Sequence, residues 1–539
     1  MRADRFEFWI YRQCSNRLES GELYVDDSLS HKCFDHELLH LTDNDPRLKD
    51  LELPCLHRPI EEQLAESYRE LRELWTFFNI KLKRGELKHL QYDTTDKKLA
   101  WRKIKCDDNE EEIYRFYEQL PHNDITDILR FVNERCNFLS AFCPLRERYI
   151  KQAVDEDALL AVIIAQAMNY SRGKMAEISD INCNTLDRVY EQYVRYMSLC
   201  DANDFISEAI ADLPIFPYYS LDLMTLYGSV DGQKYEVDHP TAKARHAKKY
   251  WGKGRGVVAY TLLINHIPLQ AKTIGAHEHE SYFVFDICQG NTTDITPDVI
   301  SGDMHSINKA NFAILKWFNM DFRPRFTSID NQLKHIYCND DIKNYTDYLI
   351  KPTEQLDHQL MVEEWSNIKS IIATLANKEI TQNKIIRKLC TYKQNRTRKA
   401  VFEFDKLYRS IYTLKYLLDS KIQKDVHRSQ NRIESYHQLR GAIAQVNGKK
   451  QLAGRSDIEV DISNQCGRLI ANAIIYYNSA LLSRLLEKYQ REGNHRAIRK
   501  LQKISPVAWQ HIHLLGHYVF CSNKHAIDLE MLIAKLTLD

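Results

Sequence analysis

The spacing of apolar residues predicts a mainly helical N-terminal part. Apolar residues recur at helical spacing from Phe6 to Leu18, and Gly21 is placed to end that helix as a C-cap. A longer periodic segment runs from Pro59 to Leu82. Helical patterns return between residues 111 and 199, where Asp155 or Asp157 is a candidate cap before LLAVIIAQAM.

Two parts of the chain carry the alternation that predicts β-strands. Between Gly85 and Lys105, the runs ELKHLQY and LAWRKIK predict a hairpin. Beyond residue 220, MTLYGSVDGQKYEV, GVVAYTLLINHIPLQAKTIG, DVISGD and DFRPRF are short runs rich in β-branched and aromatic residues. We expect strands there, the first several antiparallel, with helices between them at His279–Ile287 and Lys309–Phe318.

The remainder of the chain returns to helical periodicity. Residues 345–419 are expected to be helical throughout, and further helices are expected through Glu434, from Cys466 to Lys488 and from Asp528 to Leu536. Strands followed by helices around a mixed sheet indicate an α/β core inside a mostly helical, α+β protein.

Composition narrows the class of protein without identifying a function. Hydrophobic residues make up 44% of the 539 and charged residues 27%, as in soluble globular proteins. Lys and Arg number 74, and so do Asp and Glu. Zero net charge neither supports nor excludes DNA binding, because DNA affinity comes from local clusters of Lys and Arg.

Cysteine usage and hydropathy indicate a cytoplasmic protein. Thirteen cysteines occur without a CxxC pair, which favours reduced thiols and argues against a zinc site. The charged segment Met1–Phe8 forms no signal peptide, and the longest apolar stretch, Ala158–Ala167, is too short to span a bilayer. We therefore expect no membrane partner.

Three acidic residues stand in unusual settings, although each has an ordinary explanation. Asp231 lies inside an apparent strand, where Asp is depleted, but Asp-Gly is also a common hairpin turn. Asp303 follows an apolar run and precedes a helix, as an N-cap would. Glu434 lies in a predicted helix, where a solvated face is the usual position of Glu. Composition alone does not choose these three from 74 acids.

Six ordered segments resemble the transposases of the Tn3 family of replicative, cointegrate-forming bacterial transposons. SVDGQKY is similar to that family's Ser-Ser-Asp-Gly-Gln-Arg-Phe segment around its first catalytic aspartate. The other five are KKYWGKGRGVVAY, ISGDMHS with the following FAILKWFNMDFRPRF, NRIESYHQLRGAI, NQCGRLIANAIIYYNS and SPVAWQHIHLLGHYVF. Together with weaker matches in the N-terminal part, such as ESGELYVDD at Glu19–Asp27, they run in order across roughly residues 5–522.

The chain departs from the family pattern at several positions. The second aspartate usually lies in Thr-Asp-Thr-His-Gly, whereas this chain has Gly-Asp-Met-His-Ser at residues 302–306. His513, Leu515 and His517 stand where Asn, Thr and Asp are usual. Family members are about twice as long, and their N-terminal half recognises the inverted repeats. We therefore expect either a truncated gene or a remnant of an element.

The resemblance implies an RNase-H-like mixed α/β catalytic core with a helical insertion, embedded in helical scaffold regions. Asp303 and Glu434 are 131 residues apart, which is the reason to expect the insertion. The expected regions are a mainly helical scaffold with a small hairpin (1–210), the first part of the core (211–344), the insertion (345–425), core helices with the third carboxylate (426–480) and a C-terminal helical region (481–539).

The resemblance also implies an activity and its partners. Asp231, Asp303 and Glu434 would be the catalytic residues of a DDE-type transposase and would hold Mg²⁺, as two ions, with Mn²⁺ able to substitute. Water would nick DNA at the transposon ends, and the freed 3′-hydroxyl would attack target DNA. We expect transposon-end and target DNA as partners, a homodimer, a bacterial cytoplasmic, nucleoid-associated location and no nucleotide cofactor.

Two basic clusters are expected to contact DNA phosphates, the alternative being solvated surface. The first contains Lys384, Arg387, Lys388, Lys393, Arg396, Arg398 and Lys399. The second, on a Gly-rich turn, contains Lys248, Lys249, Lys253 and Arg255. This turn lacks the strand-loop-helix order of a GxGxxG nucleotide site. Residues 277–280 (HEHE) are expected to be a solvated loop or helix start, and Trp509, His511 and Tyr518 to be packing residues.

Two other functions stay open at this point. An inactive remnant that only binds DNA would fit the altered context of Asp303. An RNase-H-like nuclease would cut without joining, and a strand-transfer assay on a pre-cut end separates it from a transposase. A helical scaffold would not explain a strand-rich core with acids at three signature positions.

Overall fold

A computed structural model describes residues 3–28, 31–39, 45–93, 98–104, 115–145, 154–222, 225–377, 382–391, 395–520, 526–536 and 538. The chain forms two compact units that interleave along the sequence. Unit 1 comprises residues 1–106, 280–289 and 298–427, and unit 2 comprises residues 107–279, 290–297 and 428–539. The expected scaffold region 1–210 and the first part of the core, 211–344, are therefore each divided between the units.

Unit 2 contains an antiparallel sheet built on β4 (Tyr227–Glu236) and β6 (Arg255–Ile264), with β7 (Ile267–Gly275) and the short β5 (Arg245–His246) also paired to β6. The expected antiparallel strands are thus confirmed. Asn265 and His266 join β6 to β7 with φ values of 45° and 75°. Two positive φ values suit a two-residue hairpin turn, because their twist matches that of the strands.

Asp231 lies in the middle of β4, opposite Thr261 of β6. The alternative of an Asp-Gly hairpin turn at this position is therefore wrong. The chain keeps its extended conformation through residues 231–232 because β6 supplies a hydrogen-bonding partner along all of β4.

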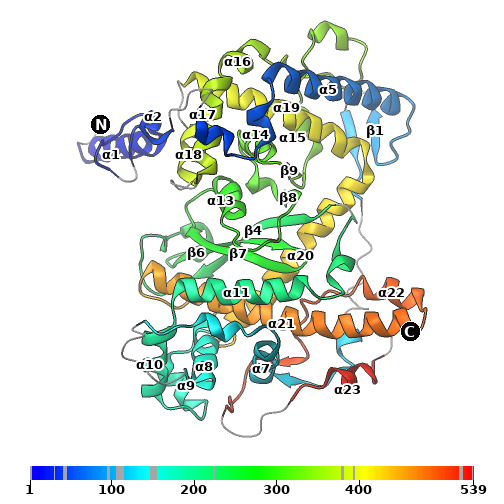
Figure 1. Cartoon of the computed structure of the whole chain (residues 1–539). Helices are drawn as coiled ribbons and strands as arrows, with labels where there is room; N and C mark the ends of the chain where they lie inside the picture. Colours follow the sequence, from blue (N-terminus) through cyan, green and yellow to red (C-terminus); the bar gives the residue numbers. More distant parts are fainter. Residues whose placement is uncertain are drawn as a thin grey trace. The chain divides into compact units, whose positions relative to one another are not determined.

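The sheet of unit 2 packs on a long central helix, α21 (Asp457–Arg491), which contacts β7, α11 (Tyr196–Ala211), α8 (Glu156–Ala167) and α7 (Ile125–Cys136) (Figure 1). Among the described residues, α21 is the one helix long and apolar enough to cross a membrane, but 94% of that window is buried inside the protein. It is the core helix of this unit.

A buried arginine fixes α21 to its neighbours. Arg468 has no exposed surface and donates from Nε to the Pro268 carbonyl and from Nη2 to a carboxylate oxygen of Asp204.

Asp155 caps α8 by accepting from the Ala158 amide, as expected. The other elements of unit 2 are η1 (Phe138–Ala141), α9 (Arg172–Glu177), α10 (Cys183–Tyr193), η3 (Phe216–Tyr219), α12 (Lys248–Trp251), α22 (His495–Leu501), α23 (Leu529–Ile533), and the paired β3 (Asn123–Asp124) and β10 (Ile512–His513).

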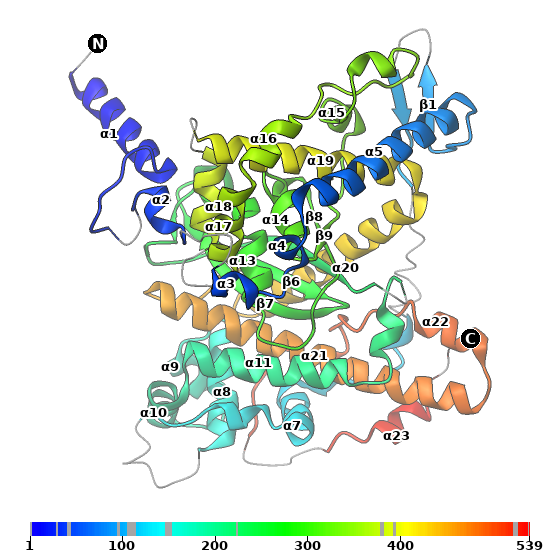
Figure 2. The ribbon, with the colours of Figure 1, turned by 45° about the horizontal axis from the view of Figure 1, so that its top comes forward.

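Unit 1 is built on α5 (Ile60–Lys83) and α19 (Arg396–Leu418), which pack together (Figure 2). Helix α19 also contacts α14 (Asn311–Trp317) and α16 (His358–Glu363). The other helical elements are α1 (Ala3–Ser20), α2 (Phe34–Glu37), α3 (Pro46–Lys49), α4 (Pro54–His57), η4 (Glu280–Phe283), α13 (Val284–Gln289), η5 (Met304–Ser306), α15 (Ile329–Leu333), η6 (Ile342–Tyr345), α17 (Trp365–Ala376) and α18 (Gln382–Thr391).

Two strand pairs belong to unit 1. β1 (Leu90–Asp93) and β2 (Lys98–Trp101) form the expected antiparallel hairpin. β8 (Val299–Gly302) pairs in parallel with β9 (Asp321–Phe322), and α14 lies between them in the sequence. Parallel strands need such a crossover connection.

The expectation of continuous helix across residues 345–419 is wrong for residues 346–357. This stretch has no helix, and Gln355 forms an isolated bridge with Cys338. Pro352 lacks an amide hydrogen and disfavours helical backbone at the preceding residue. Helices resume at His358 and continue to α20 (Ser420–Ala444), which begins in unit 1 and ends in unit 2.

Candidate active site

Asp231 presents its carboxylate from the centre of β4. Alternation along a strand places Ser229, Asp231 and Gln233 on one face. The side chain of Asp231 is 23% exposed, and its Oδ1 accepts a hydrogen bond from the Gly232 amide at 2.8 Å. The carboxylate is therefore held by its own strand while remaining accessible to solvent.

Helix α20 runs along this face of β4, in contact with the residues on either side of Asp231. The Ser229 hydroxyl donates to the Ser429 carbonyl at 2.8 Å, and the Gln233 amide donates to the His437 carbonyl at 2.5 Å. Four residues of strand span about 13 Å, and eight residues of helix span about 12 Å. Because these lengths agree, Glu434 lies level with Asp231. Glu434 is exposed.

His437 lies one turn beyond Glu434 and faces Asp231. Its Nδ1 is 3.6 Å from Oδ2 of Asp231. Burial, together with the positive charges of Lys450, Arg440 and Lys234, lowers the pKa of His437 to about 3. The imidazole is therefore neutral at physiological pH. Its buried Nε2 has no hydrogen-bond partner among the described residues.

Asp303 follows β8 directly in unit 1. Its Oδ1 accepts from the His305 amide at 2.8 Å, so it caps the short η5. The N-cap interpretation is confirmed, and it is compatible with a ligand role because a carboxylate has a second oxygen. The helix that follows is also capped, since the Phe312 amide donates to Oδ1 of buried Asp405.

The three carboxylates are distributed over both units: Asp303 belongs to unit 1, whereas Asp231 and Glu434 belong to unit 2. Their convergence on one metal site stays a prediction. Among the residues that the structure describes, no three His, Cys, Asp or Glu side chains form a group that could hold a metal ion. Asp231 and Glu434 are thus both in unit 2, at the same level along the contact between β4 and α20.

The Gly-rich turn near Asp231 presents an aromatic ring among lysines. Lys248, Lys249 and Lys253 are exposed. Tyr250 is 40% exposed, and its ring centre lies 4.6 Å from Nζ of Lys234 and 5.0 Å from Nζ of Lys249. Our sequence analysis missed Lys234 and Tyr250, although aromatic residues interleaved with lysines are typical of single-stranded nucleic-acid surfaces.

Packing explains the glycines of this turn. A side chain at Gly256 would overlap the Tyr235 carbonyl and the ring of Trp251, and one at Gly254 would crowd Trp251. The glycines therefore let Trp251 pack closely against the backbone at residues 254 and 256. Arg255 is half-buried at the start of β6.

The structure corrects the first basic cluster, that of residues 384–399. Lys388 is buried, forms an ion pair with Glu37 at 2.5 Å and donates to the Lys32 carbonyl, so it is not available to DNA. It lies on the buried face of α18, and its partner is 351 residues away in the sequence.

Two more members of that cluster are engaged within unit 1. Arg396 pairs with Glu363 and Glu364, and Arg398 donates to the Leu389 and Cys390 carbonyls. Lys393 lies outside the described residues. Lys399 is exposed, whereas Lys384 and Arg387 are half-buried. The cluster therefore offers fewer surface cations than its sequence indicates.

Two further sets of residues behave as the sequence predicts. Glu278 accepts from the Gly275 amide at 2.9 Å, and residues 277–279 form a loop before η4. His511 stacks on Tyr117 at 4.7 Å and bonds to Asn478, and burial lowers its pKa to about 3. Tyr518 is also buried. His511 and Tyr518 are therefore packing residues, as the sequence predicts.

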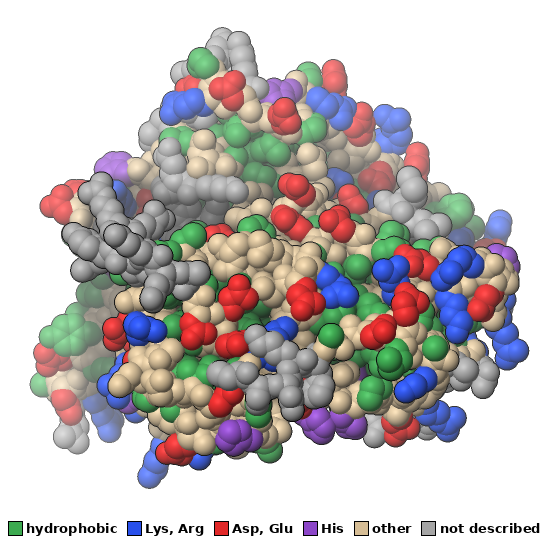
Figure 3. Space-filling view, turned by 60° about the horizontal axis from the view of Figure 1, so that its bottom comes forward, with side chains coloured by type: hydrophobic (Ala, Val, Ile, Leu, Met, Phe, Trp, Pro, Cys, Tyr) green, Lys and Arg blue, Asp and Glu red, His purple; other side chains and the backbone are tan. Residues whose placement is uncertain are grey.

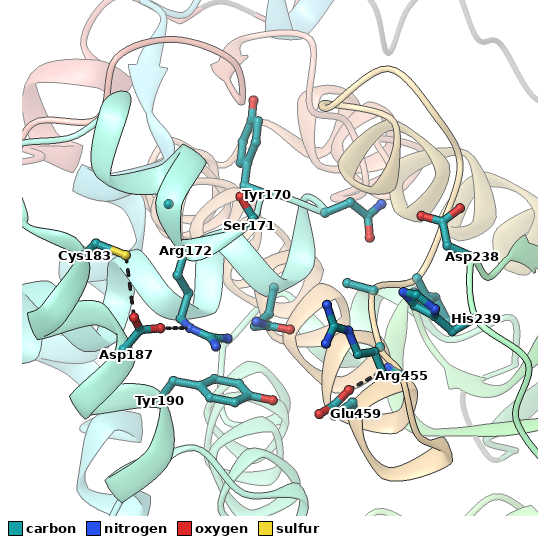
Figure 4. A pocket seen from close by; sticks show the side chains of 16 residues that line it. Tyr170, Ser171, Arg172, Cys183, Asp187, Tyr190, Asp238, His239, Arg455 and Glu459 are labelled. Atoms are coloured by element: carbon teal, nitrogen blue, oxygen red, sulfur yellow. Dashed lines mark hydrogen bonds and ion pairs between the residues drawn. The ribbon is translucent and has the colours of Figure 1, made fainter.

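A cavity of about 590 Å³ lies elsewhere in unit 2, lined by α9, α10, the segment after β4 and the start of α21 (Figure 4). Arg172 bonds to Asp187 and lies 4.5 Å from the ring of Tyr190. Three carboxylates, those of Asp187, Asp238 and Glu459, line the cavity beside the guanidinium groups of Arg172 and Arg455. This balance of charge does not favour a phosphate, and we assign the cavity no part in the candidate active site.

Comparison with known proteins shows which protein family this chain belongs to. The family model of the Tn3 transposase DDE domain matches residues 127–518, a range that contains Asp231, Asp303 and Glu434. The match identifies a Tn3 transposase DDE domain in this chain. The chain belongs to the Tn3 transposase family, which confirms the resemblance drawn from the six segments.

Individual relatives are similar over almost the whole chain. The transposase of transposon Tn2501 from Escherichia coli is 23% identical over 96% of this chain and 52% of its own length. That of Tn501 from Pseudomonas aeruginosa is 23% identical over 97% and 53%, and that of Tn1546 from Enterococcus faecium is 23% identical over 76% and 41%. This chain therefore spans about half the length of the first two.

Proposed function

We propose that this chain catalyses the DNA phosphoryl transfers of transposition, first nicking at transposon ends and then joining the freed 3′-hydroxyl to target DNA. The observation that carries the proposal is the alignment of α20 on β4, which brings Glu434 level with Asp231.

An RNase-H-like core is part of this proposal. Along the chain, three long antiparallel strands are followed by a parallel pair and later by the helix of Glu434. Asp231 lies on the first strand, and Asp303 follows the first strand of the parallel pair. This order supports the fold that the family resemblance implies.

The donor set fits magnesium. Asp231 and Glu434 are accessible to solvent, and Asp303 uses one oxygen as a cap. Hard carboxylate oxygens suit Mg²⁺ or Mn²⁺, and two such ions, when bound, supply activation of the attacking oxygen and stabilisation of the leaving oxygen.

The neighbouring residues have roles of their own in the proposal. His437 lies beside Asp231, and because its imidazole is neutral it does not form an ion pair with that carboxylate. Lys248, Lys249 and Lys253 lie exposed on the turn and would bind phosphates, which positions DNA without reading its sequence. Transposon-end and target DNA as substrates, a homodimer and a nucleoid-associated location belong to the same proposal.

The test is a nicking and joining assay with labelled transposon-end duplex in Mg²⁺. We expect Asp231→Ala, Asp303→Ala and Glu434→Ala each to abolish nicking. The matched control is Asp238→Ala, an exposed acid just beyond the end of β4 whose carboxylate accepts a hydrogen bond from the side chain of Gln451. A pre-cut end with a free 3′-hydroxyl tests joining separately.

The outcomes separate the competing functions. Nicking that survives in Asp231→Ala would contradict the assignment of the site. Nicking without joining would favour a nuclease. DNA binding without either reaction would favour the inactive remnant, which the altered residues Met304 and Ser306 beside Asp303 suggest as the second candidate.

A further inference from the structure

The end of α21, the turn after it and α22 carry an excess of positive charge. Residues 484–503 contain seven Lys and Arg but two Glu, whereas the whole chain has 74 of each sign. Figure 3 shows Lys and Arg side chains gathered at the right of the face in view, over this part of unit 2. The segment is therefore a local departure from a balanced surface.

Three of these cations lie on one side of α22, and a fourth follows in the turn after it. Arg496, Arg499 and Lys500 have the spacing i, i+3, i+4, which places them within about 100° around the helix axis, and Lys503 lies two residues beyond the end of α22. Ala497 and Leu501, at 2% and 0% exposure, form the buried side. Packing thus directs the basic stripe (Arg496, Arg499, Lys500 and Lys503) towards solvent.

The basic stripe has no acidic partner among the described residues. No carboxylate lies within ion-pair distance of any of its four cations, whereas nearby Arg484 pairs with Glu487 and Glu530. Four like charges gathered within eight residues repel one another. A surface of this kind gains most from a partner that carries closely spaced negative charges.

The backbone beneath the basic stripe is fixed. Gly493 takes a left-handed φ of 65° that ends α21, and the Asn494 amide donates to the Tyr489 carbonyl at 2.9 Å. The Asn494 side chain then caps α22 through the Ala497 amide at 3.1 Å. Because these bonds hold the turn, the stripe is organised before any partner binds.

Its dimensions fit duplex DNA. The eight residues from Arg496 to Lys503, six of them in α22 and two in the turn after it, span about 10 Å. Each strand of a DNA duplex carries one phosphate per about 3.4 Å of axis, so the stripe covers about three phosphates. Lysine and arginine on a helix face contact phosphates regardless of base sequence.

We propose that the basic stripe is a phosphate-binding surface for duplex DNA, separate from the two basic clusters recognised in the sequence. The inference rests on the proposed function, because it takes DNA as the substrate of this chain. Its role would be to hold the duplex and not to read its bases.

The experiment compares the salt dependence of DNA binding by the whole chain and two triple variants. Arg496→Gln, Arg499→Gln and Lys503→Gln together remove the exposed cations of the stripe. The control combines Arg69→Gln, Lys83→Gln and Lys88→Gln, three exposed cations in or beside α5, where five Glu accompany four Lys and Arg. Binding of a fluorescent duplex is measured by anisotropy at several salt concentrations.

Each cation that contacts a phosphate contributes about 0.9 to the slope of log K against log salt. We expect the slope of the stripe variant to be shallower than the wild-type slope by about two to three, because three cations are removed. The control should keep the wild-type slope. Equal slopes for wild type and the stripe variant, with both variants folded by thermal unfolding, would overturn the inference. Loss of RNA binding without loss of DNA binding would overturn it in favour of another polyanion.

Failure of the proposed function gives a different result. In that case the wild-type chain itself would show no salt-dependent DNA binding or no nicking, whatever the stripe does. A stripe variant that nicks but binds DNA with a shallower slope supports both conclusions.

Discussion

Gly467 of α21 lies against the guanidinium group of Arg440 on α20. A side chain built at Gly467 would overlap Nη1 of Arg440. Arg440 is 2% exposed, and its Nη2 donates to the backbone carbonyl and side-chain oxygen of Asn464 at 3.1 and 3.0 Å. The absence of a side chain at Gly467 is therefore what lets a buried cation pass between two core helices.

This contact predicts a large effect from a small change. Gly467→Ala must displace Arg440, and overpacking a core of this kind costs about 1–3 kcal/mol. The matched control is Gly173→Ala in α9, where the added methyl group meets only the Ser171 hydroxyl at 4.0 Å. Urea unfolding measures both variants, and equal free energies of unfolding would contradict the prediction.

The buried ion pair between Lys388 and Glu37 predicts an asymmetry between single and double variants. Both side chains are 3% exposed, so Lys388→Met leaves an unpaired buried carboxylate and should lower the free energy of unfolding by about 3–5 kcal/mol. Adding Glu37→Leu should recover most of that loss. Lys174→Met, at an exposed pair with Glu177, is the control with little expected change. No recovery in the double variant would contradict this account.

Asp405 predicts a pH dependence of stability. Burial raises the pKa of Asp405 to about 7 from its ordinary 3.8, although Arg409 and two backbone amides lower it in part. The folded state therefore keeps a proton that the unfolded state loses. Its contribution to the free energy of unfolding is full below pH 4 and falls as pH rises to about 7, by up to about 4 kcal/mol.

Asp405→Asn removes this titration and keeps an acceptor for the Phe312 amide. We expect the variant to lose less stability than wild type between pH 4 and pH 8. Urea unfolding at both pH values checks it, and parallel losses in the two proteins would show that Asp405 titrates normally when folded.

DNA binding by this chain is expected to be weak, strongly salt-dependent and almost independent of sequence. The exposed cations found here lie on a turn and on helix faces, where they meet phosphates and not base edges. Titrations with the inverted repeat and a scrambled duplex at two salt concentrations test it. A preference for the repeat above about tenfold, or about 1.4 kcal/mol, would place sequence recognition within these 539 residues.

Local patterns predicted the elements better than the positions of their partners. The antiparallel strands and the hairpin of β1 and β2 follow from alternation alone. The position of Asp231 inside a strand does not follow from local pattern, because the turn preference of Asp-Gly competes with pairing to Thr261, thirty residues away. Only the family resemblance distinguished this residue from the other acids.

Long-range contacts account for what the sequence could not predict. The sequence predicts Lys388 to be a surface residue because its ion-pair partner, Glu37, is 351 residues away. The basic stripe was not predicted because apolar residues and Gln separate its cations in the sequence, and only the burial of Ala497 and Leu501 shows that these cations face solvent together. The interleaving of the two units is likewise invisible to periodicity.

That interleaving has a consequence for biosynthesis. Helix α5 packs on α19, which begins more than three hundred residues later. At about 5–20 residues per second, the ribosome needs about 15–60 s to make the intervening chain. Throughout that interval Leu71, Trp75 and Phe78, all buried in the finished protein, have no partner from α19. The nascent chain should therefore depend on chaperones until its second half emerges, and synonymous codons that slow translation of residues 84–395 should lower the soluble yield.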